Sequence, residues 1–296
     1  MLGAVYDRRG RLLGDSERAK SNRAWSGNPS RLPEGLGEDA DRLPGRTFFG
    51  GHLRDAFGHL LLEVMPRFWP DLAYQEFDHV LLCSTVVGRA SGPIQPYAAD
   101  LLAGLGVDPA SCVRLADRPL VCEELTVATA PFVLKHAVHP AFLQPFERAC
   151  GSLVGEGTGT ASSMTGRRLY FSRGRLPASR RRAANEAELE AILVGAGFDV
   201  IHPQEMPIRD QVAAVDGADA LAGCDGSALH LAAFARPGTV LLAIDSRPVL
   251  NQFMIDGVRG VDAVHVLAAA QRTDRTGRWV ADLDLVRQGL AAAALA

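Results

Sequence analysis

A histidine and a glutamate placed four residues apart are the first side chains whose spacing points to proton transfer. They lie in residues 50–69, GGHLRDAFGHLLLEVMPRFW, where apolar residues recur at helical spacing and form one stripe. A second, polar stripe runs beside it at about 100° per residue and consists of Asp55, His59, Glu63 and Arg67. Such side chains at the border of buried surface can act as a general base on a hydroxyl nucleophile. A surface helix with ion pairs is the alternative, and Pro66 is expected to kink or end the helix before Arg67.

Seven arginines are concentrated in residues 167–182, RRLYFSRGRLPASRRR, a stretch without an acidic residue. Arg173 comes just after a predicted strand, at the edge where open α/β sheets bind their ligands. Arg181 follows before a predicted helix. Because guanidinium groups bind phosphate through two parallel hydrogen bonds, the pattern predicts a clamp for a diphosphate. A solvated basic loop is the alternative.

A strand, a turn and a helix are expected across residues 223–230, GCDGSALH. The backbone N–H groups of Gly226, Ser227 and Ala228 would then point out of the helix N-terminus, where anions bind, and Ser227 could add its hydroxyl. The alternative is that Asp225 or Ser227 only caps the helix. The sequence contains no dinucleotide-binding or Walker A glycine loop.

Two weaker patterns complete the candidate chemistry. Asn251 and Gln252 follow a strand end and could touch a donor or an acceptor, although such residues more often form turns. Asp282 and Asp284 resemble the metal-binding Asp-x-Asp of some transferases, but they lie in the expected C-terminal helix, away from the other sites. No metal site is therefore expected.

The elements that must position these residues are expected in two halves separated by a glycine-rich linker. Residues 1–46 are expected to form an irregular arm with one short hairpin at 4–13. Residues 47–150 alternate between strand and helix and predict a layered α/β domain. Its strands are expected at 77–84 and at 124–134, the second interrupted by Pro131, and its helices at 95–105 and 140–153. Residues 151–166 hold five glycines and six serines or threonines, which indicates a flexible linker and the domain boundary.

The second half, residues 167–280, repeats strand and helix and predicts a parallel, doubly wound sheet. Strands are expected at 168–172, 198–202, 220–224 and 239–245, with helices between them, one of them over 226–234. Another helix is expected to begin at Asn185, with Glu188 close to completing a capping box. Residues 281–296 are expected to form a C-terminal helix that packs back on this domain.

Composition fits an ordinary folded protein and argues against several classes. Of the 296 residues, 47% are apolar and 22% charged, which excludes a mainly disordered chain. A formal net charge of −3 argues against nucleic-acid binding, and no apolar run is long enough to span a membrane. The first residues lack the apolar core of a secretory signal, and five scattered cysteines indicate neither a disulfide framework nor a zinc site. These features favour the cytoplasm, with peripheral attachment to the inner face of the membrane left open.

Taken in order, the three chemical stretches resemble the catalytic region of glycosyltransferase family 61, which includes bacterial capsular-polysaccharide transferases. The family's first motif is a histidine followed four residues later by an acid, and its second is a strand ending in Ser-Arg followed by R-R-x-x-N-E. Its third is G-x-H-G-A-x-L followed by F-x-x-P-G. These motifs correspond here to His59 and Glu63, Ser172 and Arg173, and residues 181–186, 223–229 and 234–238. The resemblance extends over about residues 48–245.

One departure from the family pattern falls in the third motif. Asp225 stands where the family has histidine, and Leu231 stands where it usually has asparagine. His230 is therefore a candidate to take over a role in donor binding; otherwise the donor itself differs. The residues expected to bind the donor are Arg173, Arg181, Asp225, Gly226, Ser227, Ala228 and His230.

The resemblance implies a GT-B architecture, in which two Rossmann-like domains face each other across a cleft. It implies an inverting glycosyltransferase that needs neither a metal nor another cofactor and takes a nucleotide-sugar as donor, with a UDP-linked sugar as first choice. Glu63 is the leading candidate for the base, held and tuned by His59, with Asp55 in reserve. The acceptor is expected to be a hydroxyl of a surface polysaccharide or lipid-linked glycan. A pyruvyl transferase acting on a glycan and a non-catalytic nucleotide- or glycan-binding relative are the alternatives, and a homo-oligomer is left open.

Overall fold

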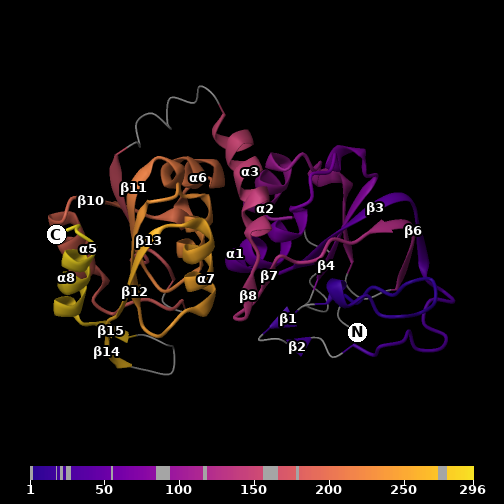
Figure 1. The fold of residues 1–296 in the computed structure, drawn as a ribbon, viewed down its shortest axis with the longest axis horizontal. Coiled ribbons are helices and arrows are strands. Elements are labelled where there is room, and N and C mark those ends of the chain that lie inside the picture. Colours follow the sequence, from indigo (N-terminus) through magenta and orange to yellow (C-terminus); the bar gives the residue numbers. More distant parts are fainter. Residues whose placement is uncertain are drawn as a thin grey trace. The chain divides into compact units, whose positions relative to one another are not determined.

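The computed structural model of the chain describes residues 3–17, 19–20, 23–24, 28–54, 56–84, 94–115, 119–155, 166–177, 180–272 and 279–296. The chain divides into two units, Met1–Ser152 and Leu153–Ala296 (Figure 1). Each unit is built around its own parallel sheet. The α/β class expected from the sequence is therefore confirmed.

The sheet of the first unit has four parallel strands in the order β5-β4-β3-β6. These strands are β3 (Asp41–Leu53), β4 (His79–Ser84), β5 (Cys112–Leu115) and β6 (Leu120–Thr126). β3 lies inside the sheet, and its residues from Thr47 onward are buried. Phe48 packs on one face against Phe68. Phe49 packs on the other face against Leu81, so both faces of the sheet are covered, as is usual for parallel strands.

Short helices connect the strands of the first unit. They are α1 (Phe57–His59), η2 (Leu60–Val64), η3 (Met65–Phe68), η4 (Tyr74–Glu76), α2 (Pro96–Gly104), η5 (Pro109–Ser111), η6 (Pro140–Leu143) and α3 (Gln144–Val154). The small antiparallel pairs are β1 (Ala19–Lys20) with β2 (Arg23–Ala24), and β7 (Phe132–Val133) with β8 (Ala137–Val138). The expected interruption of the run 124–134 at Pro131 is confirmed, because β6 ends at Thr126 and β7 begins only after Pro131, which has no N–H for a strand ladder.

The N-terminal segment forms the hairpin expected at 4–13. Tyr6 pairs antiparallel with Leu12, and Val5 packs into the cluster around Phe49. The following 3-10 turn, η1 (Gly14–Ser16), buries Ser16, whose hydroxyl accepts a hydrogen bond from the Val5 N–H at 3.0 Å. This segment therefore covers part of one face of the first sheet.

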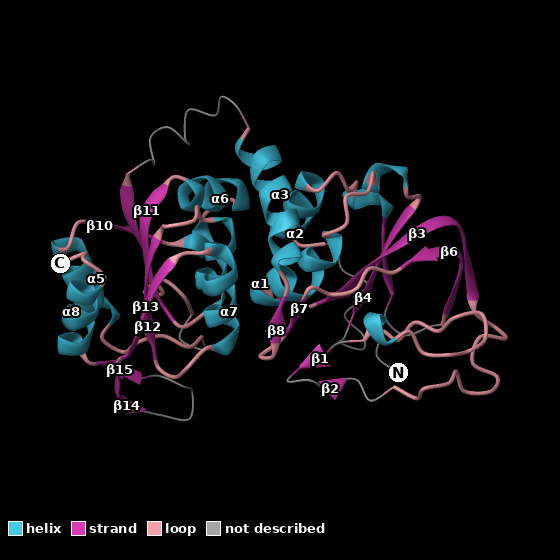
Figure 2. Ribbon diagram, viewed as in Figure 1, coloured by secondary structure: helices cyan, strands magenta, loops and turns pink. Residues whose placement is uncertain are grey.

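The sheet of the second unit has five parallel strands in the order β10-β9-β11-β12-β13. Its strands are β9 (Arg167–Phe171), β10 (Phe198–Ile201), β11 (Ala218–Cys224), β12 (Val240–Asp245) and β13 (Asp262–Leu267). Figure 2 shows helices on both faces, with α5 (Glu186–Gly195) and α8 (Leu283–Ala292) on one and α6 (Ile208–Asp216) and α7 (Leu250–Arg259) on the other. The parallel, doubly wound sheet is therefore confirmed.

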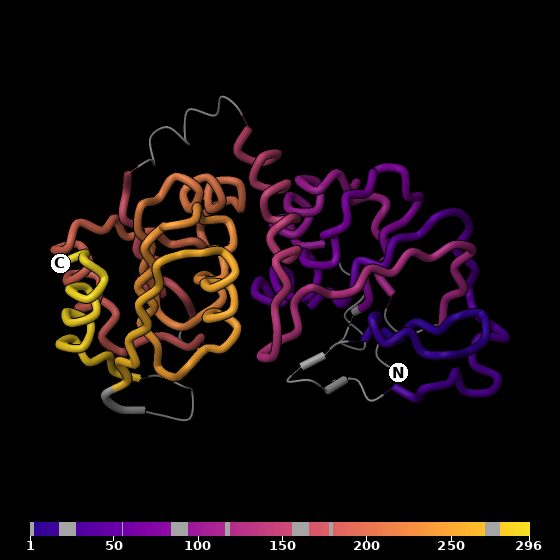
Figure 3. Tube along the Cα trace, viewed as in Figure 1, coloured from indigo at the N-terminus to yellow at the C-terminus, as the bar shows by residue number. Residues whose placement is uncertain are grey.

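The remaining elements of the second unit are short. They are η7 (Pro203–Glu205), η8 (Ser227–Phe234) and the antiparallel pair β14 (Ala269–Arg272) and β15 (Trp279–Ala281). The tube in Figure 3 shows the yellow C-terminal helix α8 running beside α5, which confirms that the C-terminal helix packs back on this unit. Asp282 caps α8 by accepting hydrogen bonds from the N–H groups of Asp284 and Leu285, so its carboxylate has a structural role.

Two expectations about the second unit need correction. Asn185 precedes α5, but its side chain makes no capping hydrogen bond. Its amide instead pairs with the backbone N–H and C=O of Ala281, at 2.9 and 3.0 Å, and so ties the start of α5 to β15. The helix expected over 226–234 is a 3-10 helix, η8.

Three observations concern the linker, the cysteines and the membrane. Helix α3 continues to Val154, so residues 151–154 of the expected linker are helical, while 156–165 lie outside the described residues. All five cysteines lie in the described ranges, and none of them forms a disulfide there. Across these same ranges, no helix combines the length and the apolar character that a membrane crossing requires.

Candidate active site

The helical segment after β3 changes its winding twice before it ends. The short α-helical turn α1 is followed by the π-helical turn η2 and then by the 3-10 turn η3. Pro66, at the start of η3, has no N–H, and in a regular α-helix its ring would collide with the carbonyl of Leu62. A widened turn before the proline avoids this collision. The single regular helix expected over this stretch is therefore wrong, although the expected effect of Pro66 is confirmed.

His59 and Glu63 meet on this segment as the spacing predicted. The Nδ1 atom of His59 and the Oε2 atom of Glu63 are joined by a hydrogen bond. The side chain of Glu63 is 9% exposed and that of His59 33% exposed, so the pair lies at the border of the core. The third member of the expected line, Asp55, lies outside the described residues.

Arg54 fixes the protonation of the His59 ring. Its Nη1 atom lies 3.4 Å from Nε2 of His59. A guanidinium group can only donate a hydrogen bond, so Nε2 must accept, and the ring proton must sit on Nδ1. His59 therefore donates from Nδ1 to Glu63 and holds the carboxylate in one orientation.

Arg67 leaves the polar stripe and has a structural role. Its guanidinium is buried and donates to the carbonyl oxygens of Asp15, at 2.8 Å, and Ala128, at 3.1 Å. It also lies over the ring of Phe49, 5.0 Å from the ring centroid. Burial lowers the pKa of Arg67 to about 10, which leaves it charged at neutral pH. Arg67 thus ties the N-terminal segment to the first sheet.

The second unit has a topological switch point between β9 and β11. From β9 the chain moves outward to β10, then crosses back to β11 and continues in the opposite direction. Open α/β sheets bind ligands at the carboxyl edge of such a point, because the two following loops leave in opposite directions. The residues at that edge are Arg173, after β9, and Gly226, after β11.

Arg173 lies directly against Gly226. A Cβ atom added to Gly226 would stand 2.0 Å from Nη1 of Arg173, so only glycine leaves room for the guanidinium in this position. Nε of Arg173 donates to the carbonyl oxygen of Arg181 at 2.7 Å. The structure therefore brings both predicted arginines and the glycine turn together at the switch point.

Glu186 holds the backbone of Arg173 from the other side. Its Oε1 atom accepts from the Arg173 N–H at 2.8 Å and from the Tyr170 hydroxyl at 2.8 Å. The glutamate is buried, so these bonds are shielded from water. The sequence analysis assigned no role to this acid. The structure shows that Glu186 holds the loop that carries Arg173.

Asp225 orients Arg181 at the same edge. Its Oδ2 atom accepts from Nη1 of Arg181 and from the hydroxyl of Ser246, both at 3.0 Å. The Asp225 side chain is 2% exposed, whereas that of Arg181 is 42% exposed. A buried carboxylate thus anchors a guanidinium that reaches into solvent.

Gly226, Ser227 and Ala228 form the turn into η8 and its first residues, and all three are partly exposed. The first N–H groups of a helix have no partner inside it, and this also holds for a 3-10 helix. Leu229 is the residue whose N–H closes the first turn, onto the carbonyl oxygen of Gly226 at 3.2 Å. The turn therefore offers N–H groups beside Arg173.

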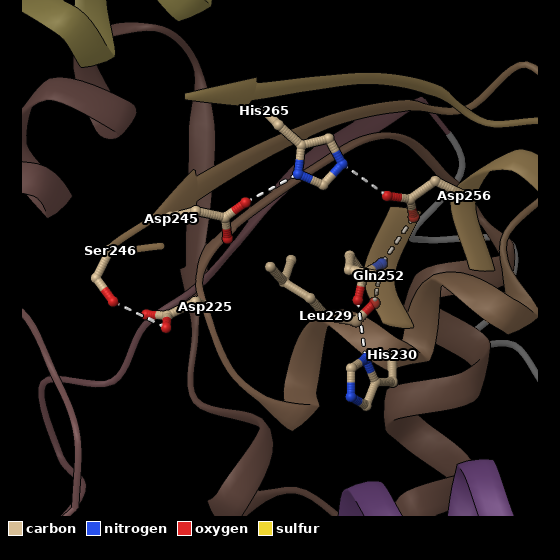
Figure 4. Close-up of polar contacts among 8 residues, drawn as sticks. All are labelled: Asp225, Leu229, His230, Asp245, Ser246, Gln252, Asp256 and His265. Carbon is tan, nitrogen blue, oxygen red and sulfur yellow. Dashed lines mark hydrogen bonds and ion pairs between the residues drawn. The ribbon is translucent and has the colours of Figure 1, made fainter. Parts of the chain in front are cut away.

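His230 belongs to a buried network that the sequence analysis did not find (Figure 4). Its Nδ1 atom pairs with Oε1 of Gln252 at 2.9 Å. Nε2 of Gln252 donates to Oδ1 of Asp256 at 2.7 Å. His265 then bridges Asp256 and Asp245, 2.9 Å from each. Only Gln252 and Asp256, four residues apart on α7, are related by helical spacing; the other members come together only when η8, β12, β13 and α7 pack.

The comparisons with known proteins agree with the motifs. A search of curated proteins gives no match. A comparison with protein families matches residues 57–242 to Glycosyltransferase 61, which is more than half of the chain and includes His59, Glu63, Arg173 and Gly226. The chain therefore belongs to glycosyltransferase family 61 and is a glycosyltransferase.

Proposed function

We propose that this glycosyltransferase is inverting and metal-independent, and that it transfers a sugar from a nucleotide-sugar, with UDP as the first choice of nucleotide, to a hydroxyl of a surface polysaccharide or glycan. The proposal includes the GT-B architecture, with the donor on the second unit and the base on the first. It also includes a bacterial capsular role and a cytoplasmic location, with attachment to the inner face of the membrane as a variant. The capsular role is supported by the motif resemblance, and the cytoplasmic location by the composition.

The observation that carries the proposal is the contact of Arg173 with Gly226 at the switch point. A diphosphate at this edge would meet the guanidinium groups of Arg173 and Arg181 and the N–H groups of Ser227 and Ala228. These groups can stabilise the negative charge that develops on the leaving nucleoside diphosphate, as a divalent cation does in other enzymes. Asp225 would act by orienting Arg181, to which it is hydrogen-bonded.

The chemistry on the acceptor side is assigned to Glu63. Its carboxylate takes the proton of the acceptor hydroxyl while the hydroxyl oxygen forms a bond to the anomeric carbon of the sugar. The bond from that carbon to the diphosphate breaks on the opposite side, its electron pair stays with the phosphate oxygen, and the configuration inverts. His59 supports this role because its Nδ1 proton is donated to Glu63, which keeps the carboxylate oriented.

A thermal-shift screen against UDP-, GDP-, CMP- and dTDP-sugars, each with and without EDTA, tests the donor. A ligand that binds only the folded protein at about 100 times its Kd stabilises it by about 2.7 kcal/mol. We expect UDP-sugars to raise the melting temperature equally with and without EDTA. A shift that EDTA abolishes would overturn the metal-independent proposal, and no shift with any donor would overturn the donor assignment.

The mass of the product then separates the candidate reactions. A transferred sugar and a pyruvyl ketal add different masses to a glycan acceptor, so mass spectrometry of the acceptor distinguishes them. Nucleotide binding without transfer or donor hydrolysis, across a broad acceptor panel, would favour the non-catalytic relative. Family membership supports sugar transfer among these outcomes.

A further inference from the structure

Arg54 connects the end of β3 to the pair formed by His59 and Glu63. β3 ends at Leu53, so Arg54 is the first residue after a strand that is buried inside the first sheet. Its Nη1 atom lies 3.4 Å from Nε2 of His59. Arg54 also lies before the first residue that matches the family, Phe57. A residue outside the matched region therefore touches the pair to which the chemistry on the acceptor side is assigned.

The backbone of Glu63 is held against the same strand, at Gly51. A Cβ atom added to Gly51 would stand 3.0 Å from the backbone oxygen of Glu63 and 2.7 Å from Cδ of Arg67. Gly51 also has φ +97°, a conformation that glycine adopts readily and other residues rarely do. The glycine therefore lets the π-helical turn η2 lie directly on β3, which fixes the position of the Glu63 backbone.

The contact at Gly51 fixes the backbone of Glu63 but not its side chain. The carboxylate is held by His59, whose own side chain is 33% exposed and belongs to the three-residue turn α1. An imidazole in such a place can rotate about two side-chain bonds. The contacts of Nδ1 with Glu63 and of Nε2 with Arg54 hold the ring at two of its atoms and oppose this rotation.

The two contacts of the His59 ring also differ in direction. A guanidinium group can only donate, so Nε2 accepts from Arg54, and a carboxylate can only accept, so Nδ1 donates to Glu63. A ring turned over about its Cβ–Cγ bond would place a carbon where each nitrogen now lies and would lose both hydrogen bonds. Arg54 therefore favours the one ring orientation in which His59 donates to Glu63.

We propose that Arg54 is a positioning residue for the transfer reaction, because it holds the His59 ring that orients the carboxylate of Glu63 toward the acceptor hydroxyl. This inference rests on the proposed function for the role of Glu63 as the base. The contacts form a closed circuit that begins and ends on β3: Arg54 holds His59, His59 holds the Glu63 side chain, and the Glu63 backbone returns to the strand at Gly51. A general base must lie within hydrogen-bond reach of the proton that it removes. Loss of the Arg54 contact should therefore lower the rate of transfer and leave donor binding unchanged.

The hold on the ring can be measured on the free protein by NMR of the chain labelled with ¹⁵N-histidine. We expect a His59 Nδ1–H signal that exchanges slowly with water in the wild type and in Arg54→Lys, which keeps a donor. We expect this signal to be lost in Arg54→Met, which keeps most of the length of the side chain but has no N–H. An unchanged His59 signal in Arg54→Met, or a wild-type ring protonated only on Nε2, would overturn the inference. Neither result depends on the identity of the donor.

Kinetics of the same variants test the role in transfer, with turnover measured as release of UDP from a UDP-sugar in the presence of a glycan acceptor. We expect Arg54→Met to lower kcat about tenfold, the effect of one lost hydrogen bond, and Arg54→Lys to restore most of it. The Kd of the UDP-sugar, measured by calorimetry, should be the same in both variants as in the wild type. Arg42→Met, at an exposed arginine of the same strand, is the matched control and should behave as the wild type.

Glu63→Gln separates the failure of the inference from the failure of the proposed function. If Glu63→Gln loses turnover while Arg54→Met turns over like the wild type, only the inference is overturned. If Glu63→Gln keeps the turnover of the wild type, Glu63 is not the base, and the role of Arg54 in transfer fails with the proposed mechanism. Should Arg54→Met not fold, Arg54→Gln replaces it, because its polar side chain suits the partly exposed position but is too short to bring an N–H to His59.

Discussion

Replacing Gly226 by alanine should displace Arg173 while leaving the backbone intact. The added Cβ atom would stand 2.0 Å from Nη1 and 3.0 Å from Cζ of Arg173, whereas ordinary contacts begin at 3.4 Å. Gly226 has φ 169° and ψ 169°, an extended conformation that alanine adopts without strain. The flexible guanidinium therefore has to move away from the switch point, and the fold should survive.

The size of the effect follows from the interaction that Arg173 would lose. A hydrogen bond to a charged group contributes about 1.5–3 kcal/mol, which corresponds to an increase in the Kd of the UDP-sugar of about 10–150-fold. Isothermal titration calorimetry measures this Kd directly. Gly257→Ala in α7 is the matched control, because its added Cβ would meet no atom within 4 Å, and we expect it to bind the donor like the wild type.

A double variant tests whether the loss arises through Arg173. In a chain that already carries Arg173→Ala, the change Gly226→Ala should cause little further loss, since the side chain that it displaces is gone. The reasoning is refuted if Gly226→Ala alone binds the donor with the affinity of the wild type. It is also refuted if Gly226→Ala weakens donor binding by the same factor in the wild type and in the Arg173→Ala variant.

Three further predictions concern stability and loop support. Arg67→Met should lower the free energy of unfolding by about 1–3 kcal/mol, because it removes the donor from the carbonyl oxygens of Asp15 and Ala128, the second of them buried, and urea denaturation measures this loss. Glu186→Ala should weaken both stability and donor binding, while Glu186→Gln, which keeps the acceptor for the Arg173 N–H and Tyr170, should restore them. His265 has a pKa raised to about 9 from 6.5, so its stabilisation is complete below pH 6.5 and is lost as the pH rises through 9. This loss is about 3.5 kcal/mol, from a pKa difference of about 2.5 at about 1.4 kcal/mol per pKa unit; His265→Gln should flatten the pH dependence.

The elements with a clear periodic pattern could be predicted from the sequence. The strands of the second unit and its doubly wound order follow from apolar runs separated by helix-length segments. The winding of the helical segment before Pro66 could not be predicted, because it depends on how a proline is accommodated against a packed sheet. His265 interrupts the apolar sequence of β13, and β14 is only four residues long, so a search for apolar runs did not find either strand.

The candidate site could be predicted only where its members are close in the chain. His59 and Glu63 share one turn of helix, so their hydrogen bond follows from their spacing. Arg181 and Asp225 lie 44 positions apart, and only the switch point of the sheet brings them together. The network around His265 was missed for the same reason, since its members come from η8, β12, β13 and α7.

The most direct test of the proposed mechanism is transfer by Glu63→Gln, followed by mass spectrometry of the acceptor, beside calorimetry with the same UDP-sugar. The glutamine keeps the size of the side chain but cannot take a proton. We predict that the variant binds the donor with the Kd of the wild type and that kcat falls by about 10²–10⁴-fold. Turnover near that of the wild type would contradict the assignment of Glu63 as the base.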